Sequence, residues 1–305
     1  MIEMHILPEV KDALAGGGPV VALESTIVTH GMRFPENLQT ARSVEDDVRE
    51  AGAVPATIAV LDGVLKIGLT AAELDLLAQA SAVAKLSRAD LALALSQGWT
   101  GSTTVAATMI AARKVGIEVF ATGGIGGVHK GAELSMDISA DLRELAQTAV
   151  NVVAAGAKAI LDLPKTLEVL ETLGVPVIAV GQDEFPAFWS RHSGLKAPLR
   201  VDDAAAIARS FRARQALGLP GGQLVACPIP ADAEIPAAEL RPVIETALSD
   251  ASQLGVEGKA VTPFLLERIF DLTGGRSLAA NIALVRNNAR LAAAIAGELA
   301  GHQEG

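Results

Sequence analysis

Residues 122–129 read Thr-Gly-Gly-Ile-Gly-Gly-Val-His and follow directly on the apolar run at residues 116–121. That run is typical of a buried strand. Four glycines in five residues weaken both helices and strands, so they suit backbone that must come very close to another group. Polar residues follow the loop: His129, Lys130, Glu133, Asp137, Ser139 and Asp141. A strand, a glycine loop and polar residues in this order are typical of the carboxyl edge of the sheet in an α/β enzyme. Glycine loops also serve as plain connections, and the polar residues are what favour a site.

Strand and helix patterns alternate on both sides of this loop. Strands are predicted at residues 19–23, 57–61, 64–67, 82–86, 159–162 and 176–180. Helices are predicted at residues 36–51, 87–96, 105–114, 142–155, 164–173 and 278–299, with another that begins at a capping box of Thr70 and Glu73. The Asp62-Gly63 pair predicts a hairpin turn, which makes the sheet mixed. We therefore expect one α/β domain over residues 1–305.

The composition limits the classes of function. Half of the 305 residues are apolar, but only nine are aromatic and none is tyrosine, so aliphatic side chains build the core. A net charge of −10 argues against a nucleic-acid-binding protein, which needs a basic stripe. The only cysteine, Cys227, excludes an internal disulfide and fits a reducing compartment. The first residues lack a signal-peptide pattern, and no uncharged apolar run is long enough to span a membrane. We expect a cytoplasmic protein with no membrane or nucleic-acid partner.

Small and hydroxylic residues at positions 101–104, Gly-Ser-Thr-Thr, precede the predicted helix at residues 105–114. Unpaired N–H groups and the helix dipole attract anions at such a start, and this predicts a phosphate site around Thr104. The alternative is an ordinary N-cap made by a serine or threonine.

Two lysines lie within apolar sequence. Lys158 falls in the segment Ala-Gly-Ala-Lys-Ala-Ile-Leu at residues 155–161, and Lys85 falls in Ala-Val-Ala-Lys-Leu at residues 82–86. Desolvation favours a neutral amine, which can attack a carbonyl group and form a Schiff base. The alternative is a lysine that reaches the surface along its aliphatic stem. Together the two lysines predict that one holds substrate charge and the other does covalent chemistry.

Carboxylates supply the remaining candidates. Glu24 follows the first predicted strand and is a candidate acid or base, or else a capping or solvent-facing carboxylate. Asp137 and Asp141 are hard oxygen ligands of the kind that suit Mg²⁺ or Mn²⁺. Asp141 also fits the first turn of a helix, so Asp137 is the better metal candidate and Asp141 could contact substrate.

Several segments together resemble the pseudouridine-5′-phosphate glycosidase family, also described as indigoidine synthase A-like. They occur in family order across nearly the whole chain, at residues 22–32, 34–37, 122–129, 137–142, 156–162, 176–177, 226–230 and 279–282. One such motif would be weak, but their combination is specific.

The resemblance implies a three-layer α/β/α sandwich, a homotrimer and one Mn²⁺, or another divalent cation, per subunit. It implies reversible cleavage of the C–C glycosidic bond of pseudouridine 5′-phosphate to uracil and ribose 5-phosphate. Lys158 matches the Schiff-base nucleophile, Glu24 the proton donor and Asp137 the metal ligand. The substrate-binding positions implied or expected are Lys85, Thr104, Val105, Thr122, His129, Ser139, Ala140, Asp141 and Asn281.

Two other functions share part of this pattern. A Schiff-base aldolase for another sugar phosphate would need the lysine and the phosphate site, but no uracil pocket. A non-catalytic sugar-phosphate-binding protein would need only the phosphate site.

Overall fold

The computed structural model describes residues 3–256, 258 and 261–301. Its strands are β1 (Met4–Ile6), β2 (Val20–Leu23), β3 (Val54–Leu61), β4 (Val64–Ile67), β5 (Ala84–Leu86), β6 (Gly101–Thr103), β7 (Val119–Ala121), β8 (Asn151–Ala154), β9 (Val177–Val180), β10 (Leu199–Val201) and β11 (Gln223–Ala226). Its α-helices are α1 (Pro8–Ala15), α2 (Glu36–Glu50), α3 (Ala71–Gln79), α4 (Leu91–Ser96), α5 (Val105–Lys114), α6 (Ala132–Ser135), α7 (Ala140–Gln147), α8 (Leu163–Thr172), α9 (Ala204–Ala216), α10 (Ala237–Gln253), α11 (Val261–Leu272) and α12 (Arg276–Ala300). A π-helix, η1 (Ile27–Gly31), follows β2.

The strands form one mixed sheet in the order β1-β4-β3-β2-β7-β8-β11-β9-β10, with β6 joined to β3 and β5 joined to β6. From β3 to β10 every pair along this path is parallel, whereas β3 pairs antiparallel with β4 and β6. The central strands are buried along their whole length and are apolar except for Asn151 in β8, as expected of parallel strands covered on both faces. Their register brings the carboxyl ends of β2, β7 and β8 side by side.

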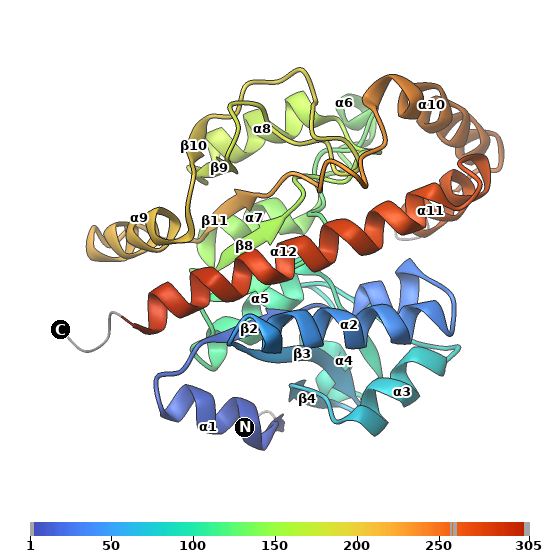
Figure 1. Cartoon of the computed structure of the whole chain (residues 1–305). Helices are drawn as coiled ribbons and strands as arrows, with labels where there is room; N and C mark the ends of the chain where they lie inside the picture. The colour runs from blue at the N-terminus through green and yellow to red at the C-terminus, as the bar shows by residue number, and fades with distance from the viewer. Residues whose placement is uncertain (1–2, 257, 259–260, 302–305) are drawn as a thin grey trace.

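Helices cover both faces of this sheet and confirm the three-layer sandwich. Helix α12 crosses β2, β7 and β8 and packs beside α2 and α9, while α5 packs on β2, β3 and β7 and against α7 (Figure 1). The main hydrophobic cluster extends from Val10 to Leu299, and a smaller second cluster lies between η1, α2 and α3.

A buried carboxylate ties α12 to α2. The side chain of Asp47, on α2, is 1% exposed and accepts hydrogen bonds from Nε of Arg286 at 2.6 Å and from Nη2 of Arg290 at 2.6 Å. Two further bonds, of 3.0 and 3.1 Å, come from the same guanidinium groups. This contact fixes how the long helix lies across the sheet, and α12 also carries Asn281 into the site described below.

The sequence predictions fail in one region that matters for the site. The helix predicted at residues 142–155 ends at Gln147, and Asn151–Ala154 is the buried strand β8. The strand predicted at residues 159–162 is a turn. A short, mostly apolar run has no clear alternation that separates strand from helix, which explains the error. Gly156, at φ +86°, turns the chain after β8 where a residue with a side chain would be strained.

Other elements agree with prediction or differ in extent. The Asp62-Gly63 hairpin, the capping box of Thr70 and Glu73, and the last helix are confirmed. The helix predicted at residues 87–96 covers only Leu91–Ser96. Strands β1, β6, β10 and β11 were not predicted, and three of them are only three residues long.

Candidate active site

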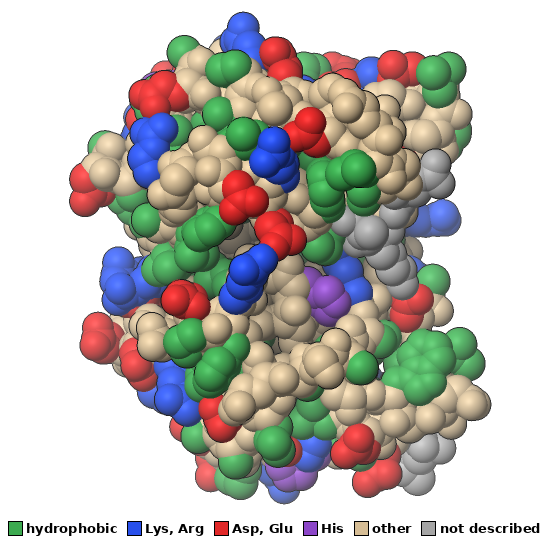
Figure 2. Space-filling view, turned by 90° about the vertical axis from the view of Figure 1, so that its right-hand side faces the viewer, with side chains coloured by type: hydrophobic (Ala, Val, Ile, Leu, Met, Phe, Trp, Pro, Cys, Tyr) green, Lys and Arg blue, Asp and Glu red, His purple; other side chains and the backbone are tan. Residues whose placement is uncertain are grey.

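Three of the predicted residues follow neighbouring strands at the carboxyl edge of the sheet. Glu24 follows β2, Thr122 follows β7 and Lys158 comes four residues after the end of β8. Glu24 and Lys158 line one cleft together with Lys85, from β5, and Asn281, from α12. The cleft holds about 580 Å³ of empty space including its open mouth. Figure 2 shows a hollow across the middle of the molecule where basic, acidic and histidine side chains gather.

The carboxylate of Glu24 is held on both oxygens. The hydroxyl of Thr122 donates to Oε1 and the hydroxyl of Thr26 donates to Oε2. Glu24 is only 9% exposed and Thr122 is 1% exposed, so these bonds have little competition from solvent. The two hydroxyls therefore fix the carboxylate at the wall of the cleft, where it can exchange protons with a bound molecule.

The glycine loop continues the pairing of β7 with β8 beyond both strands. The N–H of Ala155 donates to the carbonyl of Gly123 at 2.9 Å, and that of Ile125 donates to the carbonyl of Gly156 at 3.1 Å. The N–H of Lys158 then donates to the carbonyl of Ile125 at 3.1 Å. The backbone of Lys158 is thus fixed by the loop, and its half-buried side chain reaches the cleft.

The glycines are required because other side chains press against them. A Cβ on Gly126 would lie 2.3 Å from Oγ of Ser139, and one on Gly127 would lie 2.5 Å from Oγ1 of Thr166. A Cβ on Gly124 would lie 2.7 Å from the ring of Phe188. Gly123 and Gly124 also line the cleft. The close approach expected from the sequence is therefore made, at Gly126 and Gly127, to the chain itself.

Two helix starts meet beside this loop. Asp141, in the first turn of α7, accepts from the N–H of Ala106 in α5 at 3.0 Å and from the N–H of Gly126 at 2.8 Å. The hydroxyl of Ser139 accepts from the N–H of Asp141 at 3.2 Å, and that of Thr104 accepts from the N–H of Ala107 at 3.5 Å.

The predicted substrate-binding positions 104–105 and 139–141 therefore lie close together. The sequence left open an ordinary N-cap or an anion-binding helix start at this place. The structure has features of both, because the caps are present and two helix N-termini converge. Val105 is buried and Ala140 is exposed. Contact of these residues with substrate stays a prediction.

Positive charge collects around the two histidines nearest the lysines. Burial is the main cause that lowers the pKa of His129, with Lys158 and Lys85 acting in the same direction and Asp137 opposing them. Burial and then Lys85 lower the pKa of His30. Both rings are consequently held in the neutral form near pH 7, and the basic surroundings suit an anionic molecule.

The position of Asp137 meets only part of what a metal site requires. Its side chain is 46% exposed, and Oδ2 lies 4.0 Å from Nδ1 of His129. Among the described residues no group of three or more His, Cys, Asp or Glu side chains could enclose a metal ion. A single exposed carboxylate fits a hard divalent cation that keeps most of its water ligands.

Other residues of the cleft were not proposed from the sequence. His30, Thr26 and Phe188 line it, as do Thr262, Pro263 and Leu266 at and near the start of α11. His30 belongs to the π-helix η1, and its Nδ1 lies 2.5 Å from Oγ1 of Thr29 and 3.3 Å from Oγ of Ser102. His30 lies in the family-like segment at residues 22–32, which was a signal for it. No such signal marked Phe188, which is 164 residues after Glu24 in the sequence.

The fold and the cleft define a three-layer α/β protein with a lysine and carboxylate site at the carboxyl edge of its sheet. The chain belongs to the indigoidine synthase A-like family, whose model matches residues 9–298. This confirms the family inferred from the sequence motifs.

Curated relatives match over almost their whole length. A protein of Jannaschia sp. (strain CCS1) is 71% identical over 289 residues, which cover 95% of this chain and 96% of the relative. One from Paracoccus denitrificans is 69% identical over 295 residues, with 96% and 97% covered. Both relatives are named pseudouridine-5′-phosphate glycosidase.

Solved structures with the same fold are also related in sequence. The prealnumycin C-glycosynthase AlnA, solved in complex with ribulose 5-phosphate, is 38% identical with a TM-score of 0.91, over 99% of this chain and 98% of its own. An indigoidine synthase A-like protein of Thermotoga maritima is 34% identical with a TM-score of 0.90, over 98% and 97%. Within the described part of the chain, no helix has the length and apolar character needed to cross a membrane.

Proposed function

We propose that this protein is a pseudouridine-5′-phosphate glycosidase, which reversibly cleaves the C–C bond between uracil and ribose 5-phosphate. The observation that carries the proposal is the shared cleft of Glu24 and Lys158, beside Lys85 and Asn281. Curated relatives about 70% identical over nearly the full chain bear this name, which supports the same assignment.

The chemistry explains why a lysine is useful. The leaving atom is a carbon, C5 of uracil, so two carboxylates alone are a poor catalyst. We propose that Nζ of Lys158 bonds to C1′ as the C1′–O4′ bond breaks and O4′ takes a proton. Once uracil C5 is protonated, the nitrogen lone pair forms a C1′=N iminium, and the electrons of the C1′–C5 bond remain with uracil. One water then hydrolyses the iminium and releases ribose 5-phosphate and the free amine.

Glu24 is the proposed proton carrier in these steps. Its carboxylate lies at the end of β2, on the same cleft as Lys158, and is held by the hydroxyls of Thr26 and Thr122. A fixed carboxylate next to the reacting carbons can transfer protons without first reorganising.

The phosphate supplies binding energy away from the reacting bond. Lys85 and the converging starts of α5 and α7 are the proposed binding groups, since helix N-termini and a lysine all attract a dianion. The complex of AlnA with ribulose 5-phosphate supports a sugar phosphate as ligand in this fold. Such an anchor would orient C1′ against Lys158.

Three further features belong to the proposal. Asp137 would hold Mn²⁺ or another divalent cation, which, when bound, adds positive charge beside anionic groups of the substrate. The protein would act as a cytoplasmic homotrimer, and the exposed side chains of Leu134 and Met136 offer apolar surface for a subunit contact. Light scattering at micromolar concentration tests the trimer, and a monomer mass would reject it.

The decisive experiment combines two measurements on the wild type and on Lys158→Ala. The first follows the absorbance change as pseudouridine 5′-phosphate yields uracil. The second traps the iminium formed with ribose 5-phosphate by borohydride and locates it by peptide mass. We expect uracil release, an adduct on Lys158, and a loss of activity in the variant of more than about a thousandfold.

The alternatives give different results in the same experiment. A Schiff-base aldolase would form the adduct without releasing uracil. A sugar-phosphate-binding protein would do neither.

A further inference from the structure

Two side chains from distant parts of the sequence meet at the wall of the cleft. Trp189 lies in the connection between β9 and β10, and Asn281 lies on α12, 92 residues further along the chain. The indole Nε1–H of Trp189 donates to Oδ1 of Asn281 at 2.6 Å. Trp189 is 1% exposed, so water does not compete for this bond.

The bond decides which way the amide of Asn281 faces. An indole N–H is only a donor, so the amide atom opposite it must be the oxygen. The Nδ2 group then lies on the other side of the amide. In the described part of the chain no residue accepts a hydrogen bond from it, and Asn281 lines the cleft. The amide therefore offers donors, and not its oxygen, to a bound molecule.

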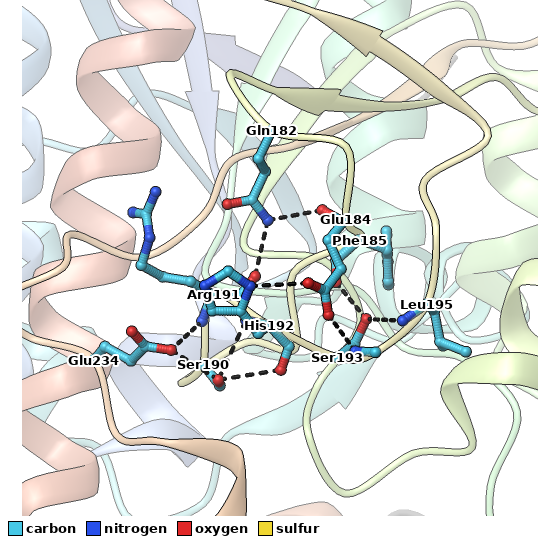
Figure 3. Close-up of polar contacts among 10 residues, drawn as sticks. Gln182, Glu184, Phe185, Ser190, Arg191, His192, Ser193, Leu195 and Glu234 are labelled. Atoms are coloured by element: carbon cyan, nitrogen blue, oxygen red, sulfur yellow. Dashed lines mark hydrogen bonds and ion pairs between the residues drawn. The ribbon is translucent and has the colours of Figure 1, made fainter.

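The residues that follow Trp189 are held by hydrogen bonds, several of which Figure 3 shows. Oε1 of Glu234 accepts from the hydroxyl of Ser190 at 2.9 Å and from the N–H of Arg191 at 2.8 Å. The carbonyl of Trp189 accepts from the N–H of Ile235 at 2.9 Å. The residue after Trp189 and its own backbone are thus anchored to residues 234–235.

Phe188 adds a second constraint. It has φ +64°, which is unusual for a bulky residue, and its N–H donates to the carbonyl of Ala155 at 3.0 Å. Its ring meets that of Trp189 edge to face, with centroids 5.0 Å apart at 61°. The indole therefore has little freedom to leave Asn281.

We infer that Trp189 is a positioning residue: it holds the Asn281 amide so that its N–H donors recognise a carbonyl oxygen of the base. This inference rests on the proposed function. A free asparagine amide could turn over and accept a hydrogen bond from an amino group, whereas the held amide cannot. The site should therefore favour uracil, which presents carbonyl oxygens, over a base with an amino group at the contacted position. A site that hydrogen-bonds a substrate group discriminates strongly against a group that leaves it unpaired.

The test uses two substrates, one with a base and one without. Pseudouridine 5′-phosphate reports on base recognition through uracil release, and ribose 5-phosphate reports on the lysine alone through the borohydride-trapped adduct. Trp189→Phe should lower kcat/KM for uracil release by about ten- to a hundredfold, since the amide oxygen of the half-buried Asn281 loses its partner. Adduct formation with ribose 5-phosphate should stay within about twofold of wild type, because that reaction involves no base.

Asn281→Asp keeps the inference testable if Trp189→Phe folds poorly, and a double variant tests whether the two residues act together. Asn281→Asp retains the oxygen that faces Trp189 and replaces the donor by an oxygen. It should lose uracil release by more than about a hundredfold while still forming the adduct. In Asn281→Ala, adding Trp189→Phe should cause little further loss of uracil release, because the indole acts through Asn281. Trp99→Phe is the matched control, since Trp99 is 38% exposed and lies outside the cleft.

The outcomes separate this inference from the proposed function. A wild type that neither releases uracil nor forms the adduct rejects the proposed function. If the wild type is active, the inference is overturned by any of three results. These are an equal loss of both readouts in Trp189→Phe, normal uracil release by Asn281→Asp, and additive effects of the Trp189 and Asn281 substitutions.

Discussion

The contact of Asp47 with Arg286 and Arg290 predicts an unusual order of stability among its variants. The carboxylate is 1% exposed, whereas the two arginine side chains are 39% and 52% exposed. Removing the carboxylate leaves two cations that can turn toward water. Removing both arginines leaves a buried anion without a partner, which is far less favourable.

The magnitudes follow from that difference in burial. Asp47→Ala should lower the free energy of unfolding by about 2 kcal/mol, because hydrogen bonds to half-exposed guanidinium groups are partly replaced by water. The double variant Arg286→Met with Arg290→Met should lower it by about 4 kcal/mol, the usual range for an unpaired buried charge. The triple variant, with Asp47→Leu added, should recover most of that loss because no charge remains buried.

Urea unfolding monitored by circular dichroism measures these differences, provided that the m-value is unchanged. Arg290→Met alone is the control, because Arg286 still pairs with Asp47. The reasoning fails if the double arginine variant is as stable as Asp47→Ala, or if the triple variant is no more stable than the double.

Three other predictions concern the site. The wild type should prefer pseudouridine 5′-phosphate over pseudouridine by about a thousandfold in kcat/KM, because charge-assisted hydrogen bonds to the phosphate contribute about 1.5–3 kcal/mol each. Lys85→Met should remove most of this preference. Equal wild-type values for the two substrates would mean that the phosphate binds elsewhere. Chelation should abolish uracil release and Mn²⁺ should restore it. Calorimetry should show weaker Mn²⁺ binding to Asp137→Asn. Full activity in excess chelator would reject the requirement for a metal ion. The pKa values of His30 and His129 are lowered from 6.5, chiefly by burial, so the unfolded chain binds more protons just below that pH. The contribution of the two histidines to stability should be constant above about pH 6.5 and should be lost as the pH falls from there to the lowered values, and His30→Gln should reduce that loss in urea midpoints.

The sequence predicted the parts of the site that are set by local pattern. Glu24 at the end of a buried strand, the glycine loop after β7 and the long last helix all lie where expected. Each depends on residues close together in the chain. The resemblance to a family then brought Lys85 and Asn281 to the same site, where local pattern gave no link between them.

The failures have physical causes of the same kind. Asn151–Ala154 is buried on both faces, so its pattern has no period, and the predicted helix extended through it. Phe188 lines the cleft and Trp189 contacts Asn281 on a segment held by Glu234 and Ala155, and those contacts join residues tens of positions apart. Such contacts are set by the finished fold and leave no mark on the neighbouring sequence.

Because the pairing of β7 with β8 continues into the loop, the residues that line the cleft stand on two kinds of backbone. The nucleophile stands on backbone that is effectively part of the sheet, so a mutation that moves it must also disturb the core. Another part of the wall comes from α12, α11 and Phe188, which lie outside the strands. Selection for a new acceptor molecule would therefore act on that wall and keep the lysine chemistry, so relatives of this protein should diversify in the aglycone they join or release long before they change the way they activate the sugar.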